Sequence, residues 1–138
     1  RYGGTEIIML KYAIGIGAFM GLISVVLGAL GAHILKGHLD AEALHIFETG
    51  ARFQMHHAVM LIITGLIYGI WESKLLIVTG GFFLIGTLIF SGSLYALALS
   101  DIKILGAIAP IGGLSLMAGW AFLIIASCLA AKKYTARV

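Results

Sequence analysis

Four long apolar stretches, none of which contains an Asp, Glu, Lys or Arg residue, occupy most of this chain. A helix needs roughly 20 apolar residues to cross the hydrocarbon of a bilayer, so each stretch is long enough to span it. The runs are continuously apolar rather than alternating, and four segments cannot close a β-barrel. We therefore predict an all-α fold, a bundle of four transmembrane helices. The predicted spans are Tyr12–Ala32, Phe53–Trp71, Leu75–Leu99 and Ile104–Ala131.

The composition leaves almost no room for a water-soluble domain. Hydrophobic residues make up 61% of the 138 residues and charged residues 11%, against about 25% charged in soluble domains. We expect residues 1–138 to form a single integral membrane domain. The first span is too long for the apolar region of a signal peptide, so we expect it to stay in the mature protein. Cys128 is the only cysteine, which excludes an intramolecular disulfide and a cysteine-based metal site.

The basic residues predict the orientation in the membrane, because Lys and Arg are retained on the side from which a protein inserts. With four spans both termini lie on one side. That side would hold Arg1, Lys11, Lys74, Lys132, Lys133 and Arg137, and the other side Lys36, Arg52 and Lys103. The termini are thus predicted to be cytoplasmic in a bacterial inner membrane, or to face the matrix in a mitochondrial one. Basic residues at span ends suit anionic lipid headgroups and give no indication of nucleic-acid binding.

Small residues recur along one face of two spans, at spacings that place them under one another on a helix. We predict close helix packing at these positions, either within one chain or against another subunit. The positions are Gly17, Gly21, Ser24 and Gly28 in the first span and Gly112, Ser115 and Gly119 in the fourth.

A polar segment, residues 36–56, separates the first two spans. Its apolar residues recur with helical spacing at Leu44, Phe47, Ala51 and Met55. We therefore expect an amphipathic helix that lies at the membrane interface, with Gly50 at a bend into the second span. Glu48 and Arg52 are four residues apart and could pair on its polar face.

The histidines are the strongest candidates for chemistry. His33 ends the first span, and His56 and His57 begin the second, which predicts one membrane level for all three. Neutral imidazoles there could hold a haem iron or a metal ion, or bond to a quinone. The alternative is structural, because interfacial histidines commonly bond to backbone carbonyls or water.

Further polar residues are expected at the same side of the membrane, late in the third span and early in the fourth. Ser91 and Tyr95 are one helical turn apart, and Pro110 frees a backbone carbonyl one turn earlier. These groups predict either a small polar cavity or a packed polar cap. The whole candidate cluster consists of His33, Arg52, Gln54, His57, Ser91, Ser93, Tyr95 and Pro110.

Several motifs together carry a family resemblance over about residues 10–130. They are GALGAH at 28–33, RFQMHHA at 52–58, FSGSLYAL at 90–97, GAIAPIGG at 106–113 and GW at 119–120. In this order they resemble the small four-span membrane proteins grouped as domain of unknown function 423. The resemblance implies a bacterial inner-membrane protein, with a related branch associated with mitochondria, and implies no established activity. The chain departs from the family pattern at Ile34 and His56.

Three classes of function remain. The first, which we favour, is a non-catalytic membrane protein that forms a homo-oligomer or serves as an accessory subunit, because the spans contain no ionisable pair suited to chemistry. The second is a module that binds haem, a metal ion or a quinone through His33, His57 and Tyr95. The third is a transporter or channel for a small solute or a lipid, which four spans would usually form only as an oligomer. No nucleophile and base lie at a suggestive spacing, so an enzyme has the least support, and no resident cofactor is expected.

Overall fold

The computed structural model describes residues 4–135, which form four long helices and one short 3-10 turn. In chain order the elements are α1 (Gly4–His33), η1 (Leu35–Gly37), α2 (Ala41–Ile70), α3 (Lys74–Ser100) and α4 (Ile104–Thr135). No strand occurs within residues 4–135. All four helices are long and apolar enough to cross a membrane. The predicted all-α, four-span fold is confirmed.

Suitable capping residues stand in the short connections between successive helices. Asp40 accepts a hydrogen bond from the Ala43 backbone N–H at 2.8 Å and so caps the start of α2. Ser73 caps α3 in the same way, through the N–H of Leu75. Asp101 ends α3 in the left-handed conformation, with φ of 54°, which turns the chain sharply toward α4. These tight turns place consecutive helices antiparallel and side by side.

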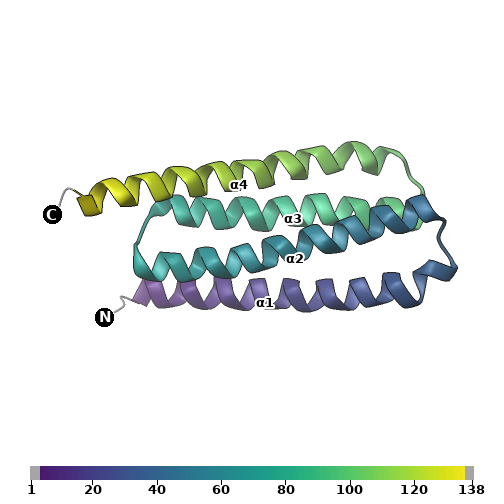
Figure 1. The fold of residues 1–138 in the computed structure, drawn as a ribbon, viewed down its shortest axis with the longest axis horizontal. Coiled ribbons are helices and arrows are strands. Elements are labelled where there is room, and N and C mark those ends of the chain that lie inside the picture. Colours follow the sequence, from purple (N-terminus) through teal and green to yellow (C-terminus); the bar gives the residue numbers. More distant parts are fainter. Residues whose placement is uncertain (1–3, 136–138) are drawn as a thin grey trace.

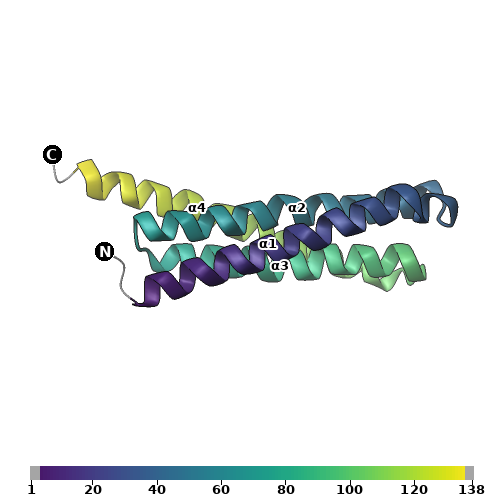
Figure 2. The same ribbon diagram turned by 90° about the horizontal axis from the view of Figure 1, so that it is seen from below.

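The helices form an open arrangement in which each one packs on its neighbours in sequence. Extensive contacts join α1 to α2, α2 to α3 and α3 to α4. Within residues 4–135, α1 and α4 share no such contact, and they lie on opposite sides of the α2–α3 pair (Figures 1 and 2). The start of α1 and the end of α4 lie at one end of the molecule, together with the α2–α3 connection (Figure 1). We call this the termini end, and the other end the η1 end.

The segment between the first two spans is helical, as predicted, but it is not a separate surface helix. Residues 41–70 form one continuous helix, and Gly50 lies inside it without a break. Buried residues recur with helical spacing from Phe47 to Tyr68, so the face that packs inward begins before the predicted second span. They are Phe47, Gly50, Ala51, Gln54, His57, Ala58, Leu61, Thr64, Gly65 and Tyr68. The predicted pairing of Glu48 with Arg52 is also absent, since Arg52 donates to the Thr49 hydroxyl.

Small residues lie where the outer helices approach the central pair. A Cβ atom added to Gly17 of α1 would lie 2.8 Å from the carbonyl oxygen of Ala58 in α2. One added to Gly112 of α4 would overlap the backbone of Phe90 in α3, at 2.7 Å from its Cα. Each outer helix therefore lies against its partner's backbone, as small-residue interfaces in membranes allow.

Candidate functional site

Two neighbouring carbonyl groups of α2 each receive a hydroxyl from a different helix. Ser24 of α1 donates to the carbonyl of Ala51 at 2.7 Å, and Ser91 of α3 donates to that of Gly50 at 2.8 Å. Both serine side chains are almost completely buried. Consecutive residues are offset by about 100° around a helix, so these two adjacent carbonyl groups can accept hydrogen bonds from helices on two different sides of α2. The pair of bonds fixes α1 and α3 against the same point of α2.

One turn further along α2, Gln54 bridges the same three helices with a single side chain. Its Nε2 donates to the Met20 carbonyl of α1 at 2.8 Å, and its Oε1 accepts from the Tyr95 hydroxyl of α3 at 2.9 Å. Gln54 is buried and Tyr95 is half-buried. Within hydrocarbon an amide without partners would be costly, so this bridge stabilises the packed arrangement of the three helices.

The absence of a side chain at Gly50 brings the Tyr95 ring close to α2. A Cβ atom there would lie 2.8 Å from Cε1 of Tyr95, too close for an unshifted ring. The Tyr95 ring also packs on Phe47, with ring centroids 5.0 Å apart. Gly50 thus allows the Tyr95 ring to approach α2 closely and does not produce the predicted bend. That approach places the Tyr95 hydroxyl at Gln54.

His57 joins α2 to the fourth helix. Its Nδ1 lies 2.8 Å from the Phe53 carbonyl, and its Nε2 lies 3.2 Å from the indole Nε1 of Trp120 in α4. A carbonyl can only accept and an indole N–H can only donate, so these partners assign a neutral ring with the proton on Nδ1. The rings of Phe53, Phe83 and Trp120 pack around the imidazole. Both nitrogens of His57 are therefore already occupied by the protein.

The three histidines do not share a membrane level, and that prediction is wrong. Gly31, near the end of α1, lies beside Phe47, whereas Gly17 lies beside Ala58, the neighbour of His57. Phe47 and His57 are ten residues apart, so His33 and His57 are separated along the helix axis by about 15 Å. The cause is the early start of α2, which runs antiparallel to α1 from Ala41 onward. His33 and His56 are both exposed.

The other predicted residues have varied positions. Arg52 and Pro110 are exposed, so neither belongs to the buried network. Ser93 bonds to the Phe90 carbonyl of its own helix.

The predicted packing positions differ in what they contact. Ser115 of α4 donates to the Phe82 carbonyl of α3 at 3.1 Å, whereas a Cβ on Gly28 would meet no atom within 4 Å. Gly119 lies against Phe83 and Gly21 against Met55 and Ala58, both at the seams described above.

The structure thus places Ser24, Gln54, His57, Ser91 and Tyr95 in one polar network around residues 50–57 of α2, where each side chain is hydrogen-bonded and Gln54 and Tyr95 bond to each other directly. In the part of the chain with described side chains, every fully buried polar side-chain atom has a hydrogen-bond partner. No group of three potential metal-binding side chains occurs among these residues. The arrangement ties helices together, and its buried polar atoms already have partners within the protein.

Sequence reasoning missed Trp120 as a member of this network. The residue stands in one of the motifs, but tryptophan in a membrane helix ordinarily indicates an interface position. Its side chain is 42% exposed, and its ring packs on Phe83 while its indole nitrogen donates to His57. The spacing of the two residues in the sequence carries no signal for this contact, which depends on the α2–α4 approach.

Comparison with known proteins places the chain in a family. A family model described as "Protein of unknown function (DUF423)" matches residues 27–113. The chain belongs to the DUF423 family. A UPF0382 membrane protein of Staphylococcus haemolyticus is 44% identical over 119 residues, which cover 86% of this chain and 96% of the relative. The predicted family membership is confirmed.

Two more distant relatives cover comparable lengths. The UPF0382 membrane protein YwdK of Bacillus subtilis is 35% identical, over 86% of this chain and 97% of the relative. The UPF0382 inner membrane protein YgdD of Escherichia coli is 36% identical, over 84% of this chain and 88% of the relative. No solved structure matches this DUF423 protein. The family names and the four membrane-length helices agree that it is a membrane protein.

Proposed function

We propose that this protein is a non-catalytic subunit of a membrane assembly, built from further copies of itself or from other membrane proteins. The open helix arrangement is the observation that supports this proposal. In the most apolar part of α1 and of α4 only 17% of residues are buried, against 33% in α2 and α3. Each outer helix packs mainly on one neighbour and leaves a face several turns long for association within the bilayer.

The use of the polar side chains supports the same proposal. The buried bonds of Ser24, Gln54, Ser91 and Tyr95 connect different helices, and such bonds contribute stability rather than chemistry. A cofactor-binding role has weaker support, because a metal or haem iron at His57 Nε2 would first have to displace Trp120. His33 is too far along α1 to act with His57 as a second ligand.

We also propose a location and an orientation. The names of the relatives support a bacterial cytoplasmic (inner) membrane, since YgdD is named an inner membrane protein. The excess of basic residues on the termini side supports cytoplasmic termini. A reporter fused to the C-terminus that folds only in the cytoplasm tests the orientation, and activity of a periplasm-specific reporter at the same position would contradict it.

Native mass spectrometry of the protein, extracted from its own membrane in mild detergent, tests the assembly. We expect a mass above that of one chain, through added copies or a different protein. Disulfide cross-linking then locates the interface in a variant in which Cys128 is replaced by Ser. We expect Phe19→Cys on α1 or Met117→Cys on α4 to cross-link, and the control Val59→Cys on α2 to remain uncoupled. A bare monomer with no cross-link at any position would overturn the proposal.

A further inference from the structure

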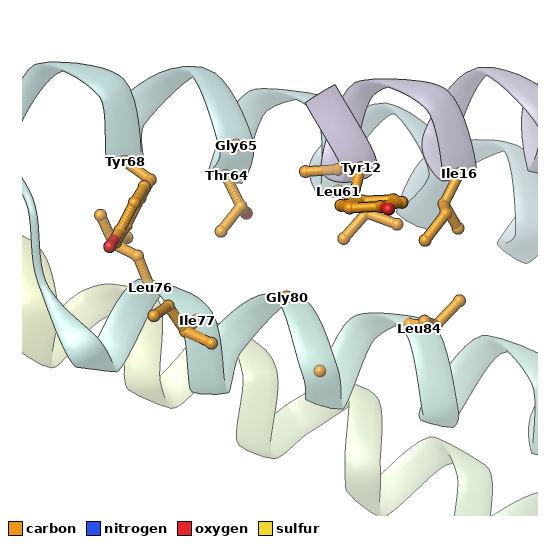
Figure 3. Close-up of a pocket in the computed structure, with 12 residues that line it drawn as sticks. Tyr12, Ile16, Leu61, Thr64, Gly65, Tyr68, Leu76, Ile77, Gly80 and Leu84 are labelled. Carbon is orange, nitrogen blue, oxygen red and sulfur yellow. The ribbon is translucent and has the colours of Figure 1, made fainter. Parts of the chain in front are cut away.

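A narrow apolar groove lies between α1 and α3 in the half of the molecule nearer the termini end. Its volume is about 240 Å³, and α2 forms its floor. Figure 3 shows side chains of α1 and α2 facing those of α3 across this space. Among its lining residues are Tyr12, Ile16, Leu61, Tyr68, Leu76 and Leu84. Since the helices span a membrane, this groove opens toward lipid rather than water.

Two glycines of α3 keep the groove open. A Cβ atom on Gly81 would meet no atom within 4 Å, and one on Gly80 would make only ordinary contact with Leu61 at 3.4 Å. These glycines therefore differ from Gly86 of the same helix, where a Cβ would lie 2.9 Å from the backbone of α4 at Leu116. At Gly80 and Gly81 the missing side chains leave a space that the chain itself does not fill.

A polar group without a partner lines this groove. The Tyr68 side chain is 9% exposed, and its hydroxyl forms no hydrogen bond with the described residues. It differs in this respect from Tyr95, Gln54 and His57, which are all bonded. Figure 3 shows the Tyr68 ring extending from α2 toward α3 beside Leu76. No fully buried polar side-chain atom among the described residues lacks a partner, so the unbonded Tyr68 hydroxyl is accessible from the groove. Lipid hydrocarbon offers it no acceptor, so a ligand that brings an acceptor oxygen would be favoured there.

Positive charges flank the same end of the groove. Lys74 opens α3 one turn before Ile77, which lines the groove, and Lys11 immediately precedes Tyr12 in α1. Both lysines are exposed, and the exposed Glu72 in the α2–α3 connection is the acidic residue beside them. Among the side chains that the structure describes beside this end of the groove, the two cations outnumber the one anion, which favours an anionic headgroup.

The length of the groove fits a lipid tail. Along α3 it extends from Leu76 to Leu84, eight residues or about 12 Å. One leaflet contributes about 15 Å of hydrocarbon, half the thickness of the bilayer core. A chain that enters near Lys74 would therefore follow the groove through most of its leaflet.

We propose that this groove binds an anionic phospholipid. One acyl chain lies in the groove, the phosphate lies between Lys11 and Lys74, and a headgroup or ester oxygen accepts the hydrogen bond of Tyr68. The proposal goes beyond the proposed function, because a single chain forms the whole site and no partner subunit is needed.

Lipid titration of the delipidated full chain, followed by native mass spectrometry, tests this site. Phosphatidylglycerol and phosphatidylcholine with identical acyl chains are the probes. We expect one tightly retained phosphatidylglycerol per chain, with phosphatidylcholine at least about tenfold weaker. Lys11→Gln combined with Lys74→Gln should abolish this preference, whereas Lys103→Gln, in the loop at the other end, should leave it unchanged.

A matched pair of glycine variants tests the groove itself. Gly81→Leu fills the groove and should reduce phosphatidylglycerol binding at least about tenfold. Gly92→Leu is the control, since Gly92 lies three turns further on the same face of α3, is exposed, and also has open space at its Cβ position. Tyr68→Phe keeps the ring but removes the hydroxyl, so it provides a second test of phosphatidylglycerol binding if Gly81→Leu fails to fold.

Three results would overturn the proposal. The first is equal binding of the two lipids by the unmodified protein. The second is equal loss of binding in the Gly81 and Gly92 variants, which would indicate a general effect of surface leucines. The third is a change in subunit number with Gly81→Leu and no change in lipid binding, which would assign the groove to a second copy of the chain.

Discussion

The η1 half and the termini half of the molecule are held together in different ways. Toward the η1 end, Ser24, Gln54, Ser91 and Tyr95 connect α1, α2 and α3 through hydrogen bonds between helices. Toward the termini end, α1 and α3 separate around an apolar groove in which the Tyr68 hydroxyl stays unbonded. The same three helices are therefore fixed to one another in one half and leave space between them in the other.

Glycines have opposite roles in the two halves of α3 and α4. Gly112 allows the backbones of α4 and α3 to touch, whereas Gly81 leaves open space. A residue type associated with tight helix packing in membranes thus marks both a very close backbone contact and an open groove. The direction in which the Cα–Cβ bond would point, rather than the presence of glycine, determines whether the position makes a close contact or leaves open space.

The largest predicted effect concerns the tightest contact. Gly112→Leu should destabilise the fold by about 3 kcal/mol or more, because its side chain would have to displace the Phe90 backbone. Reversible unfolding in mixed micelles of mild detergent and dodecyl sulfate measures this loss. Gly113→Ala is the control, since a Cβ there makes ordinary contact with Phe90 at 3.7 Å. Equal stability of the two variants would show that α3 and α4 do not lie this close.

The next effect concerns the bridge made by Gln54. Gln54→Leu removes two bonds between helices, and each such bond contributes about 0.6 kcal/mol on average and about 1.7 at most in membranes. We expect a loss of about 1–2 kcal/mol in the same unfolding assay. A double-mutant cycle with Tyr95→Phe should give a coupling near the value of one bond. Additive losses in that cycle would contradict direct contact between Gln54 and Tyr95.

A smaller effect is expected at the contact between α2 and α4. Trp120→Phe keeps an aromatic ring and removes the donor to His57 Nε2, so we expect a loss of about 0.6–1 kcal/mol. Trp71→Phe, at the end of α2, is the control and should change stability little. A larger loss at Trp71 than at Trp120 would argue against the bond to His57.

Much of the helical framework follows from the sequence, because apolar length alone determines which segments can cross a bilayer. The start of α2 was misplaced because Asp40, Glu42, Glu48 and Arg52 make its first half resemble a surface helix. The inward stripe that continues unbroken from Phe47 to Tyr68 is the signal that indicates one helix. That stripe depends on buried glycines and alanines and on Gln54, His57 and Thr64 as much as on large apolar residues.

The candidate site was predictable only in part. Gln54, Ser91 and Tyr95 stand out as polar residues in apolar surroundings, and the structure brings them together. Their partners include the carbonyls of Met20, Gly50 and Ala51, and every residue has a carbonyl group. Which carbonyl receives a hydroxyl depends on the register between two helices, and no residue type encodes that register locally.

The smallest predicted effect concerns the open half of α3 and has the opposite sign. Gly81→Ala introduces a Cβ that meets no atom, so no contact opposes the higher helix propensity of alanine. We expect unchanged stability or a gain of about 0.5 kcal/mol in the unfolding assay. Gly86→Ala on the same helix should instead destabilise, since its Cβ would meet Leu116 at 2.7 Å. A loss at Gly81 as large as that at Gly86 would mean that the groove is closed in the folded protein, and that the two halves of the molecule are packed alike.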